Sequence, residues 1–321
     1  NIVKMNEFEI IHNLKKIINN SSALNLNDDV FHDKKNSLLA SIDTYNEDIH
    51  YIKFKEPELI IKKVIRSSIS DIICKGVDPK YLLISFSGNK KHFNKKNIKL
   101  ITNSIKQEQK KYNFSLIGGD ISSAIKSSFT ITSLGFSKNI MTRNSCYKND
   151  DIYVTGNIGD SSIGLYFLKN KLKISKKLKN YFIKKYYQPN LAFGFHRELK
   201  KFATSSMDLS DGLLIDLKKL ICDKKLGFII DFNLLPKSFY FNKLAKKNIT
   251  SLFKHLFMGD DYQILFTAKH KYRKTILKYA EKWNQKITRI GNPTDSRANY
   301  LRFNGKLNKI IDYKGYIHDF R

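Results

Sequence analysis

Residues 205–221 read SSMDLSDGLLIDLKKLI, and this stretch decides the fold. The apolar run at its start predicts a strand, the polar residues 210–212 predict a turn, and apolar residues at helical spacing predict a helix over 213–221. A strand that leads directly into a helix is typical of α/β proteins. Two carboxylates, Asp208 and Asp211, stand at the junction. Capping of the helix and binding of a metal ion both explain their placement.

Other carboxylates also stand where apolar runs end, although acids are scarce, with 29 Asp and Glu against 58 Lys and Arg. The clusters are Asp28-Asp29, Asp43, Asp71, Asp120, Asp208 with Asp211, and Asp260-Asp261. Carboxylates brought together at loop ends repel one another and take up protons unless cations hold them. Mg²⁺ prefers oxygen ligands and usually binds a few carboxylates together with substrate phosphates. The pattern therefore predicts phosphate chemistry.

Apolar spacing along the chain predicts alternating strands and helices without an internal repeat. Helices are expected at 7–18, 57–76, 95–111, 160–168, 191–202 and 213–221, and strands at 38–42, 81–86, 114–117, 129–136, 152–155, 205–209, 228–232, 263–266 and 287–290. The charged stretch 138–151 is the best boundary, and 321 residues with 41% apolar content are enough for two domains. We expect an α/β (α+β) protein with domains at 1–138 and 139–321.

The net charge of +29 raises the question of nucleic-acid binding. Lysine pairs are spread along nearly every predicted helix and no recognised nucleic-acid-binding motif occurs, so solvated helix faces account for most of the charge. Three cysteines stand far apart, as expected in a reducing compartment. No run of about 18 apolar residues is present. We expect a cytoplasmic protein that binds neither nucleic acid nor a membrane.

Two glycine-containing segments are candidates for binding phosphate. Gly156 and Gly159 resemble part of a phosphate loop, but the lysine of that motif is missing, which favours a plain strand-to-helix turn. Gly118-Gly119-Asp120 is more suggestive, because adjacent glycines let backbone amides approach an oxyanion while the aspartate can hold a metal. By itself, that tripeptide is predicted to be only a turn that closes the strand at 114–117.

Several short motifs, taken in order, resemble one family over nearly the whole chain. They are Asp28-Asp29, Ser41-Ile42-Asp43 with His50, Ser70-Asp71 with Gly76-x-Asp78-Pro79, Leu116 to Asp120, Thr142-Arg143, Asp151 to Gly156, Met207 to Leu213, Gly259 to Tyr262, and Tyr313-Lys314-Gly315-Tyr316. This order resembles thiamine-monophosphate kinase, within the AIR synthetase-like group of ATP-binding proteins. The spacing from Asp43 to His50 and the C-terminal tail favour it over AIR synthetase, selenophosphate synthetase and hydrogenase-maturation relatives.

The resemblance implies ATP-dependent phosphorylation of thiamine monophosphate to thiamine diphosphate. It implies ligands for several Mg²⁺ ions at Asp29, Ser41, Ile42 through its backbone, Asp43, Asp71, Asp120, Asp208 and Asp211. It implies ATP contacts from Gly119, Asp120, Arg143 and Ser210, and thiamine monophosphate contacts from His50, Asp260 and Tyr313. It also implies a homodimer formed through the N-terminal sheet, a mixed C-terminal sheet, and an active site between the two domains.

This reaction needs little acid–base help. ATP and a phosphate monoester bring together about six negative charges near neutral pH, so their repulsion must be screened before in-line attack. The acceptor phosphate is largely ionised, since its second pKa is about 6, so we assign no general base. Tyr313 or Tyr316 can stack on a cationic thiazolium, with C-terminal packing as the alternative. A lone histidine is more often structural, but its place in the motif favours His50 as a substrate contact.

Departures from the family pattern affect the substrate side more than the metal side. Asp260 stands where Glu is usual, Asn27 where Gly is usual, Ile42 where Thr is usual, and Ser123-Ala124 where Arg-Gly is common. The shorter Asp260 can weaken a substrate contact or require a bridging water. The competing hypotheses are another AIR synthetase-like ATP-dependent enzyme and a basic nucleic-acid-binding protein. Assays with thiamine monophosphate and salt-dependent retention on DNA or RNA separate these.

Overall fold

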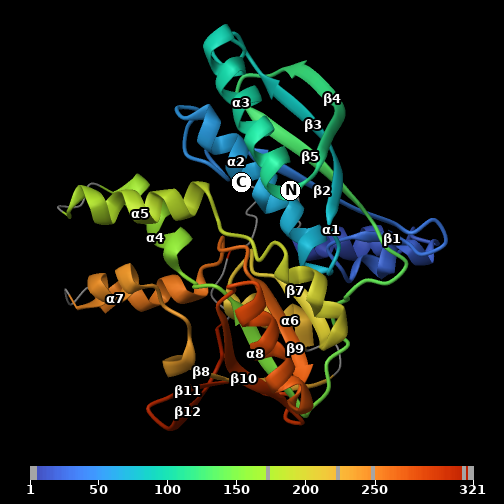
Figure 1. Ribbon diagram of the computed structural model, residues 1–321, viewed down its shortest axis with the longest axis vertical. Coiled ribbons are helices and arrows are strands. Elements are labelled where there is room, and N and C mark those ends of the chain that lie inside the picture. Colours follow the sequence, from blue (N-terminus) through green and yellow to red (C-terminus); the bar gives the residue numbers. More distant parts are fainter. Residues whose placement is uncertain (1–5, 171–173, 222–224, 247–249, 313–315, 317–321) are drawn as a thin grey trace, which may run out of the picture.

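The N-terminal lobe contains a five-stranded sheet. The computed structural model describes residues 6–170, 174–221, 225–246, 250–312 and 316. The lobe begins with α1 (Glu7–Lys15) and the 3₁₀ helix η1 (Ser21–Leu26). Its strands are β1 (Phe31–Asp33), β2 (Leu38–Asn46), β3 (Pro79–Gly88), β4 (Ser115–Ser123) and β5 (Ser128–Phe136), in the spatial order β1-β2-β5-β3-β4. Its long helices are α2 (Pro57–Cys74) and α3 (Lys95–Tyr112), beside the sheet in Figure 1.

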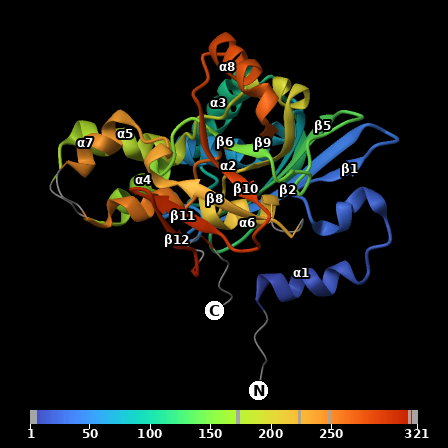
Figure 2. The same cartoon turned by 90° about the horizontal axis from the view of Figure 1, so that it is seen from below.

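The C-terminal lobe contains a seven-stranded sheet in the order β12-β11-β8-β10-β6-β9-β7. Its strands are β6 (Asp150–Thr155), β7 (Ala203–Asp208), β8 (Gly227–Asp231), β9 (Ile264–Lys269), β10 (Ile287–Thr294), β11 (Tyr300–Phe303) and β12 (Lys306–Lys309). Its helices are α4 (Asp160–Lys169), α5 (Lys176–Tyr187), α6 (Leu213–Ile221), α7 (Phe239–Ala245) and α8 (Arg273–Lys282), with 3₁₀ segments η2 (Phe195–Lys201), η4 (Phe232–Leu234), η5 (Thr250–Phe257) and η6 (His270–Tyr272). Figure 2 shows α4, α5 and α7 gathered on one side of this lobe.

Both sheets mix parallel and antiparallel pairs, since β3 pairs with β4 in parallel and β8 with β11 in parallel, while their other neighbours are antiparallel. The expected mixed α/β architecture is confirmed. Among the residues that the structure describes, none of the helices is long and apolar enough to cross a membrane.

Helix α2 belongs to the N-terminal lobe and packs against both lobes. Pro57 stands at its first turn, where a missing N–H and a fixed φ are tolerated. Ile60, Val64 and Ile65 are buried at helical spacing. The helix packs on β2 and β5 of its own lobe and on β7 of the other. A helix that is buried nearly all round carries its polar residues, Asp71 among them, into the junction between the lobes.

The structure differs from the sequence predictions in three places. Residues 118–120 do not form a turn but lie inside β4, because the chain continues to pair with β3. The α-helix expected at 191–202 is replaced by the shorter 3₁₀ helix η2, Phe195–Lys201, which Gly194 precedes with φ +93°. Several short or lysine-rich elements were not predicted, namely β1, α5, α7, α8, β11 and β12.

One face of the N-terminal sheet is exposed. Along β2, Leu39 and Ser41 are buried, whereas Ile42 between Ser41 and Asp43 is exposed. All residues of the edge strand β4 are exposed, including Ile117 and Ile121. This alternation is that of a sheet with one packed face and one open face.

Candidate active site

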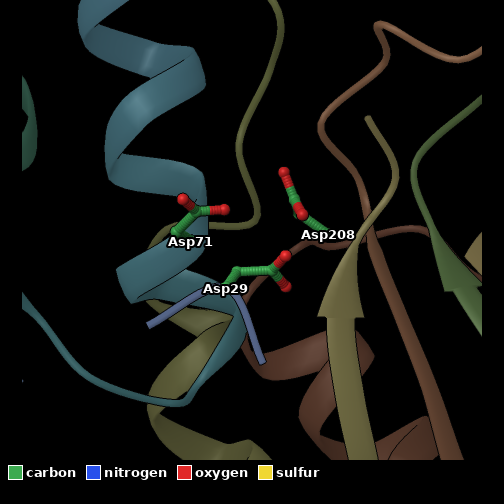
Figure 3. Close-up of side chains that lie close together, drawn as sticks. All are labelled: Asp29, Asp71 and Asp208. Atoms are coloured by element: carbon green, nitrogen blue, oxygen red, sulfur yellow. The ribbon is translucent and has the colours of Figure 1, made fainter. Parts of the chain in front are cut away.

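Three carboxylates meet where the lobes join (Figure 3). Asp29 follows η1, Asp71 lies on α2, and Asp208 ends β7. One carboxylate oxygen of each lies within 4.8 Å of the others. The fold therefore brings together acids from three distant segments, each of which the sequence singled out separately.

Asp43 interacts electrostatically with two of these carboxylates, Asp71 and Asp208. Burial, followed by the negative charge of Asp208, raises the pKa of Asp43 to about 7. Burial, with the charges of Asp43 and Asp208, raises the pKa of Asp71 well above its usual value, and burial also raises the pKa of Asp208. We call Asp29, Asp43, Asp71 and Asp208 the acidic cluster. Because burial and mutual repulsion disfavour ionisation there, a bound cation would stabilise the ionised cluster.

The acidic cluster fits a hard divalent cation. Oδ2 of Asp29 and Oδ2 of Asp43 are buried and have no hydrogen-bond partner among the described residues. Asp208 accepts one hydrogen bond, from the hydroxyl of Ser70 at 2.6 Å. Carboxylate oxygens gathered in this way are the donor set that Mg²⁺ takes in proteins. The four aspartates can therefore hold Mg²⁺.

Strand β2 orients the two residues that precede Asp43. Side chains two positions apart on a strand share a face, so Ser41 and Asp43 point to the packed side. Ser41 is buried, and its hydroxyl donates to the backbone carbonyl of Ser68 at 3.5 Å. The side chain of Ile42 is 68% exposed on the other face. A ligand role for Ile42 therefore rests with its backbone.

Two cations flank the acidic cluster. Nζ of the buried Lys75 lies 2.5 Å from Oδ1 of Asp28 and 3.6 Å from Oδ2 of Asp29. Arg143 forms an ion pair with Asp29 through its guanidinium, and its backbone N–H donates to Oδ2 of Asp28 at 3.0 Å. Asp28 and the cluster thus outnumber the cations beside them. Arg143 therefore holds its guanidinium beside the acidic cluster.

The turn between β7 and α6 is held by Asp216, which the sequence interpretation missed. Its buried carboxylate accepts the backbone N–H groups of Ser210, Asp211 and Gly212 at 3.1, 3.1 and 3.0 Å. Burial, followed by the charge of Asp211, raises the pKa of Asp216 to about 7. The Asp211 carboxylate pairs with Lys219. In the described part of the chain, neither Ser210 nor Asp211 caps α6 through its side chain, so capping does not explain them.

Gly119 and Asp120 lie apart from the acidic cluster within one chain. Both are exposed on β4, where Asp120 stands opposite Ser85 of β3. Three strand spacings separate β4 from β2, which is about 14 Å at ~4.8 Å each. A Cβ on Gly119 would lie 1.8 Å from the carbonyl oxygen of Ile84, so glycine is needed there for close strand pairing.

His50, which the sequence predicts to be a substrate contact, lies beside Tyr45 and Tyr316. Its ring packs edge-on against Tyr45, with 5.6 Å between the ring centroids, and lies 6.4 Å from the ring of Tyr316. The backbone N–H of Tyr316 donates to the carbonyl of Asp211 at 2.8 Å, which brings this part of the C-terminal tail beside the site. Tyr313, the predicted substrate contact in the tail, lies outside the described residues.

Asp260, the other predicted substrate contact, forms an ion pair with a buried lysine. Nζ of Lys63 donates to both carboxylate oxygens of Asp260, at 2.6 and 2.7 Å, and Oγ of Ser161 donates to Oδ2 at 3.2 Å. Lys63 was missed by the sequence interpretation. The available signal was its place in the apolar stripe of a predicted helix, next to Val64 and one turn after Ile60.

Comparisons of the amino-acid sequence point to one family. The family described as AIR synthase related protein, N-terminal domain, matches residues 24–137. The thiamine-monophosphate kinase of Buchnera aphidicola subsp. Acyrthosiphon pisum (strain APS) is 31% identical over 98% of this chain and 99% of its own length. The thiamine-monophosphate kinase of Escherichia coli (strain K12) is 28% identical over 89% of this chain and 87% of its own.

Solved structures agree with the sequence relatives. AaThiL complexed with AMPPCP and TMP matches with a TM-score of 0.86 and 25% identity, over 99% of this chain and 100% of that chain. Thiamine monophosphate kinase from Aquifex aeolicus matches with a TM-score of 0.81 and 25% identity, over 95% and 98%. The hydrogenase maturation protein HypE of E. coli shares the fold alone, with a TM-score of 0.69 at 15% identity over 86% and 85%.

Proposed function

The chain belongs to the thiamine-monophosphate kinase family, and we propose that it transfers a phosphoryl group in line from ATP to thiamine monophosphate, assisted by several Mg²⁺ ions. The acidic cluster carries this proposal, because three of its carboxylates converge within 4.8 Å while two of its buried oxygens have no hydrogen-bond partner in the part of the chain that the structure describes. A site built in this way suits a reaction whose main obstacle is repulsion between phosphates.

The chain's own residues provide positioning and charge at the phosphates. Mg²⁺ bound at the acidic cluster would supply positive charge against the about six negative charges of ATP and a phosphate monoester. Arg143, only 12% exposed beside Asp29, would orient a phosphate of ATP through its planar guanidinium. Ser210 and Asp211 lie on a turn that Asp216 fixes. The acceptor phosphate needs no general base, since it is already largely ionised.

We place thiamine monophosphate between His50 and Asp260, with the C-terminal tail against its ring. Support comes from Tyr316, whose ring lies near that of His50 and whose backbone is bonded to Asp211. An aromatic face there suits a cationic thiazolium. We assign Tyr313 to the same end, as the resemblance of the tail motif implies. We also keep the domain boundary at 138/139, which falls between β5 and β6.

We further propose that a second copy of the chain covers the open face of the N-terminal sheet. Ile42 of β2 and Phe136 of β5 lie on this face, at 68% and 50% exposure, and the edge strand β4 beside it carries the exposed Ile117. An unpaired edge strand with apolar side chains invites such a partner. A dimer would also explain Asp120, because a shared site lets this residue serve an acidic cluster that is three strands away within its own chain.

The decisive experiment measures ADP release from ATP and Mg²⁺ with and without thiamine monophosphate. We expect release that depends on thiamine monophosphate and yields thiamine diphosphate by mass spectrometry. Release without that acceptor, or with aminoimidazole-ribonucleotide precursors instead, would assign the site to another ATP-dependent enzyme of the same fold. Arg143→Ala should raise the KM for ATP about 10-fold and leave that for thiamine monophosphate nearly unchanged.

The dimer is tested by light scattering and by mixing two variants. Asp43→Asn and Asp120→Asn should each be inactive alone. If the sites are shared between copies, refolding the two variants together restores about a quarter of the wild-type activity, since half of the dimers are mixed and each has one intact site. No recovery in mixed dimers would mean that Asp120 serves its own chain, whereas an Asp120→Asn variant that is active alone would mean that Asp120 is only a strand residue.

A further inference from the structure

Lys63 is a charged residue in one of the least accessible places of the described chain. Its side chain is 2% exposed on α2, and its ammonium lies 4.0 Å from the ring centroid of Tyr186. Burial lowers the pKa of Lys63, and the neighbouring charge of Asp260 opposes that effect. A buried ammonium is costly unless it is paired and hydrogen-bonded. Such a cost indicates that the lysine does something an apolar residue could not do.

The first partner of Lys63 is the carboxylate of Asp260. Both oxygens accept from Nζ, and the backbone of Asp260 adopts φ +63°, after Gly259 with φ +75°. The Asp260 N–H donates to the carbonyl of Ser210 at 2.7 Å, so the loop is tied to the turn beside the acidic cluster. The Asp260 side chain is 24% exposed. Lys63 therefore fixes the orientation of a carboxylate that remains partly exposed to solvent.

The second partner of Lys63 is Tyr186, which leads to His50. The Tyr186 ring packs on the ammonium, its backbone carbonyl accepts from Nζ at 3.4 Å, and its hydroxyl donates to the backbone carbonyl of His50 at 2.8 Å. Lys63 thus contacts Asp260 directly and reaches the His50 segment through one side chain. These are the two described residues that we place against the acceptor.

We propose that Lys63 is a positioning residue that sets the geometry of the thiamine monophosphate site by orienting Asp260 and, through Tyr186, the segment of His50. The proposal rests on the proposed function. The positive charge of Lys63 balances the negative charge of Asp260. Asp260 therefore presents thiamine monophosphate with a carboxylate oxygen in a fixed direction, which can accept a hydrogen bond, rather than with a net negative charge. The shorter side chain of aspartate is compatible with that role because Lys63 donates hydrogen bonds to both of its carboxylate oxygens.

The test compares Lys63→Met with Lys62→Met, a change at the adjacent residue of α2, whose ammonium instead donates to Gln107 at 2.6 Å. For Lys63→Met we expect the KM for thiamine monophosphate to rise about 10-fold, with the KM for ATP within about twofold of wild type. Lys62→Met should leave both unchanged. Lys63→Arg, which keeps a charged donor, should recover part of the loss.

The same variants in an Asp260→Asn background show whether Lys63 acts through Asp260. There Lys63→Met should have a clearly smaller effect on the KM for thiamine monophosphate, because the two residues form one unit. If Lys63→Met does not fold, Ser161→Ala removes another side-chain donor to Asp260 and should produce a weaker change of the same kind. Equal changes in both KM values, or a lower melting temperature with unchanged KM values, would show a purely structural ion pair. An inactive wild type would instead defeat the proposed function, and this inference with it.

Discussion

The acidic cluster between the lobes and the carboxylate of Asp151 in the C-terminal sheet place the same chemical group in opposite surroundings. Asp151 is 4% exposed, and Arg273 donates to its two oxygens at 2.7 and 2.8 Å. Arg289 and His270 lie at 3.5 and 3.4 Å. Burial acts to raise the pKa of Asp151, but the hydrogen bonds of Arg273 and these charges lower it overall. In the acidic cluster, burial and neighbouring carboxylates raise the pKa of Asp43 and Asp71.

The difference is whether cations within the protein balance the charge of a buried carboxylate. A carboxylate with enough internal cations stabilises the protein and has no free capacity for a metal. A buried group of carboxylates with too few cations destabilises the protein until a cation arrives from outside. Position in the chain does not distinguish the two, since Asp151 and Asp208 both belong to strands of the same sheet.

The largest effect is expected on catalysis. Asp71→Asn should lower kcat by about 100-fold or more, because it removes an anionic ligand from the acidic cluster. Stability should be retained or increased, since the change removes a repelling charge. Purified protein is assayed for ADP release and heated to find its melting temperature. Near-normal turnover at ordinary Mg²⁺ would contradict the metal assignment, and Asp151→Asn is the control that should keep its kcat.

Mg²⁺ should stabilise the protein through the acidic cluster alone. At about 100 times the dissociation constant, a single bound ion adds about 2.7 kcal/mol to the free energy of unfolding. Thermal unfolding with MgCl₂, against NaCl of equal ionic strength, measures this gain. The gain should shrink in Asp43→Asn and persist in Asp151→Asn. An equal gain in both variants would place the ion elsewhere.

Asp151→Asn should lower the free energy of unfolding by about 1–2 kcal/mol, because it leaves basic neighbours without their carboxylate. The loss is moderate, since Arg273 and Arg289 are 46% and 47% exposed and can be rehydrated. Urea unfolding measures it. Unchanged stability would erase the contrast between Asp151 and the acidic cluster.

Local patterns predicted most of the fold because periodicity and burial coincide in the main elements. The helix expected at 213–221 is α6 with the same bounds, and the helix expected at 57–76 is α2, Pro57–Cys74. The pattern failed where polar or lysine-rich segments gain their structure from tertiary contacts, as in α8, Arg273–Lys282. It also failed at Gly118-Gly119-Asp120, where glycines serve strand pairing rather than a turn.

The candidate site was predictable as a set of acids and not as a set of contacts. Asp29, Asp71 and Asp208 could be singled out from their places at the ends of elements, and they converge. Lys63 and Asp260 are 197 positions apart, so no local pattern could pair them. Asp216 looked like an ordinary residue of the first turn of α6, and only the folded turn shows the three N–H groups that it accepts.

The smallest expected effect is on how the free energy of unfolding depends on pH, at a carboxylate that is well paired like Asp151. Glu198 is a second well-paired acid, since it accepts from Lys201 at 2.6 Å, Lys282 at 3.0 Å and the indole N–H of Trp283 at 3.0 Å. Burial acts against ionisation, but these hydrogen bonds lower the pKa of Glu198 from 4.5 to about 2. A lowered pKa in the folded state means stability that is present above pH 4.5 and lost as the pH falls towards 2.

Wild type should therefore lose its advantage over Glu198→Gln as the solution is acidified. Between pH 6 and 4 the difference in free energy of unfolding should shrink by at most about 1 kcal/mol, because the two lysines are half exposed and solvent weakens their attraction. Urea unfolding of both proteins at each pH gives the difference directly, which cancels the titration of all other groups. A difference that grows on acidification would mean that Glu198 is protonated more easily in the folded state, and Glu198 would then belong with the acidic cluster rather than with Asp151.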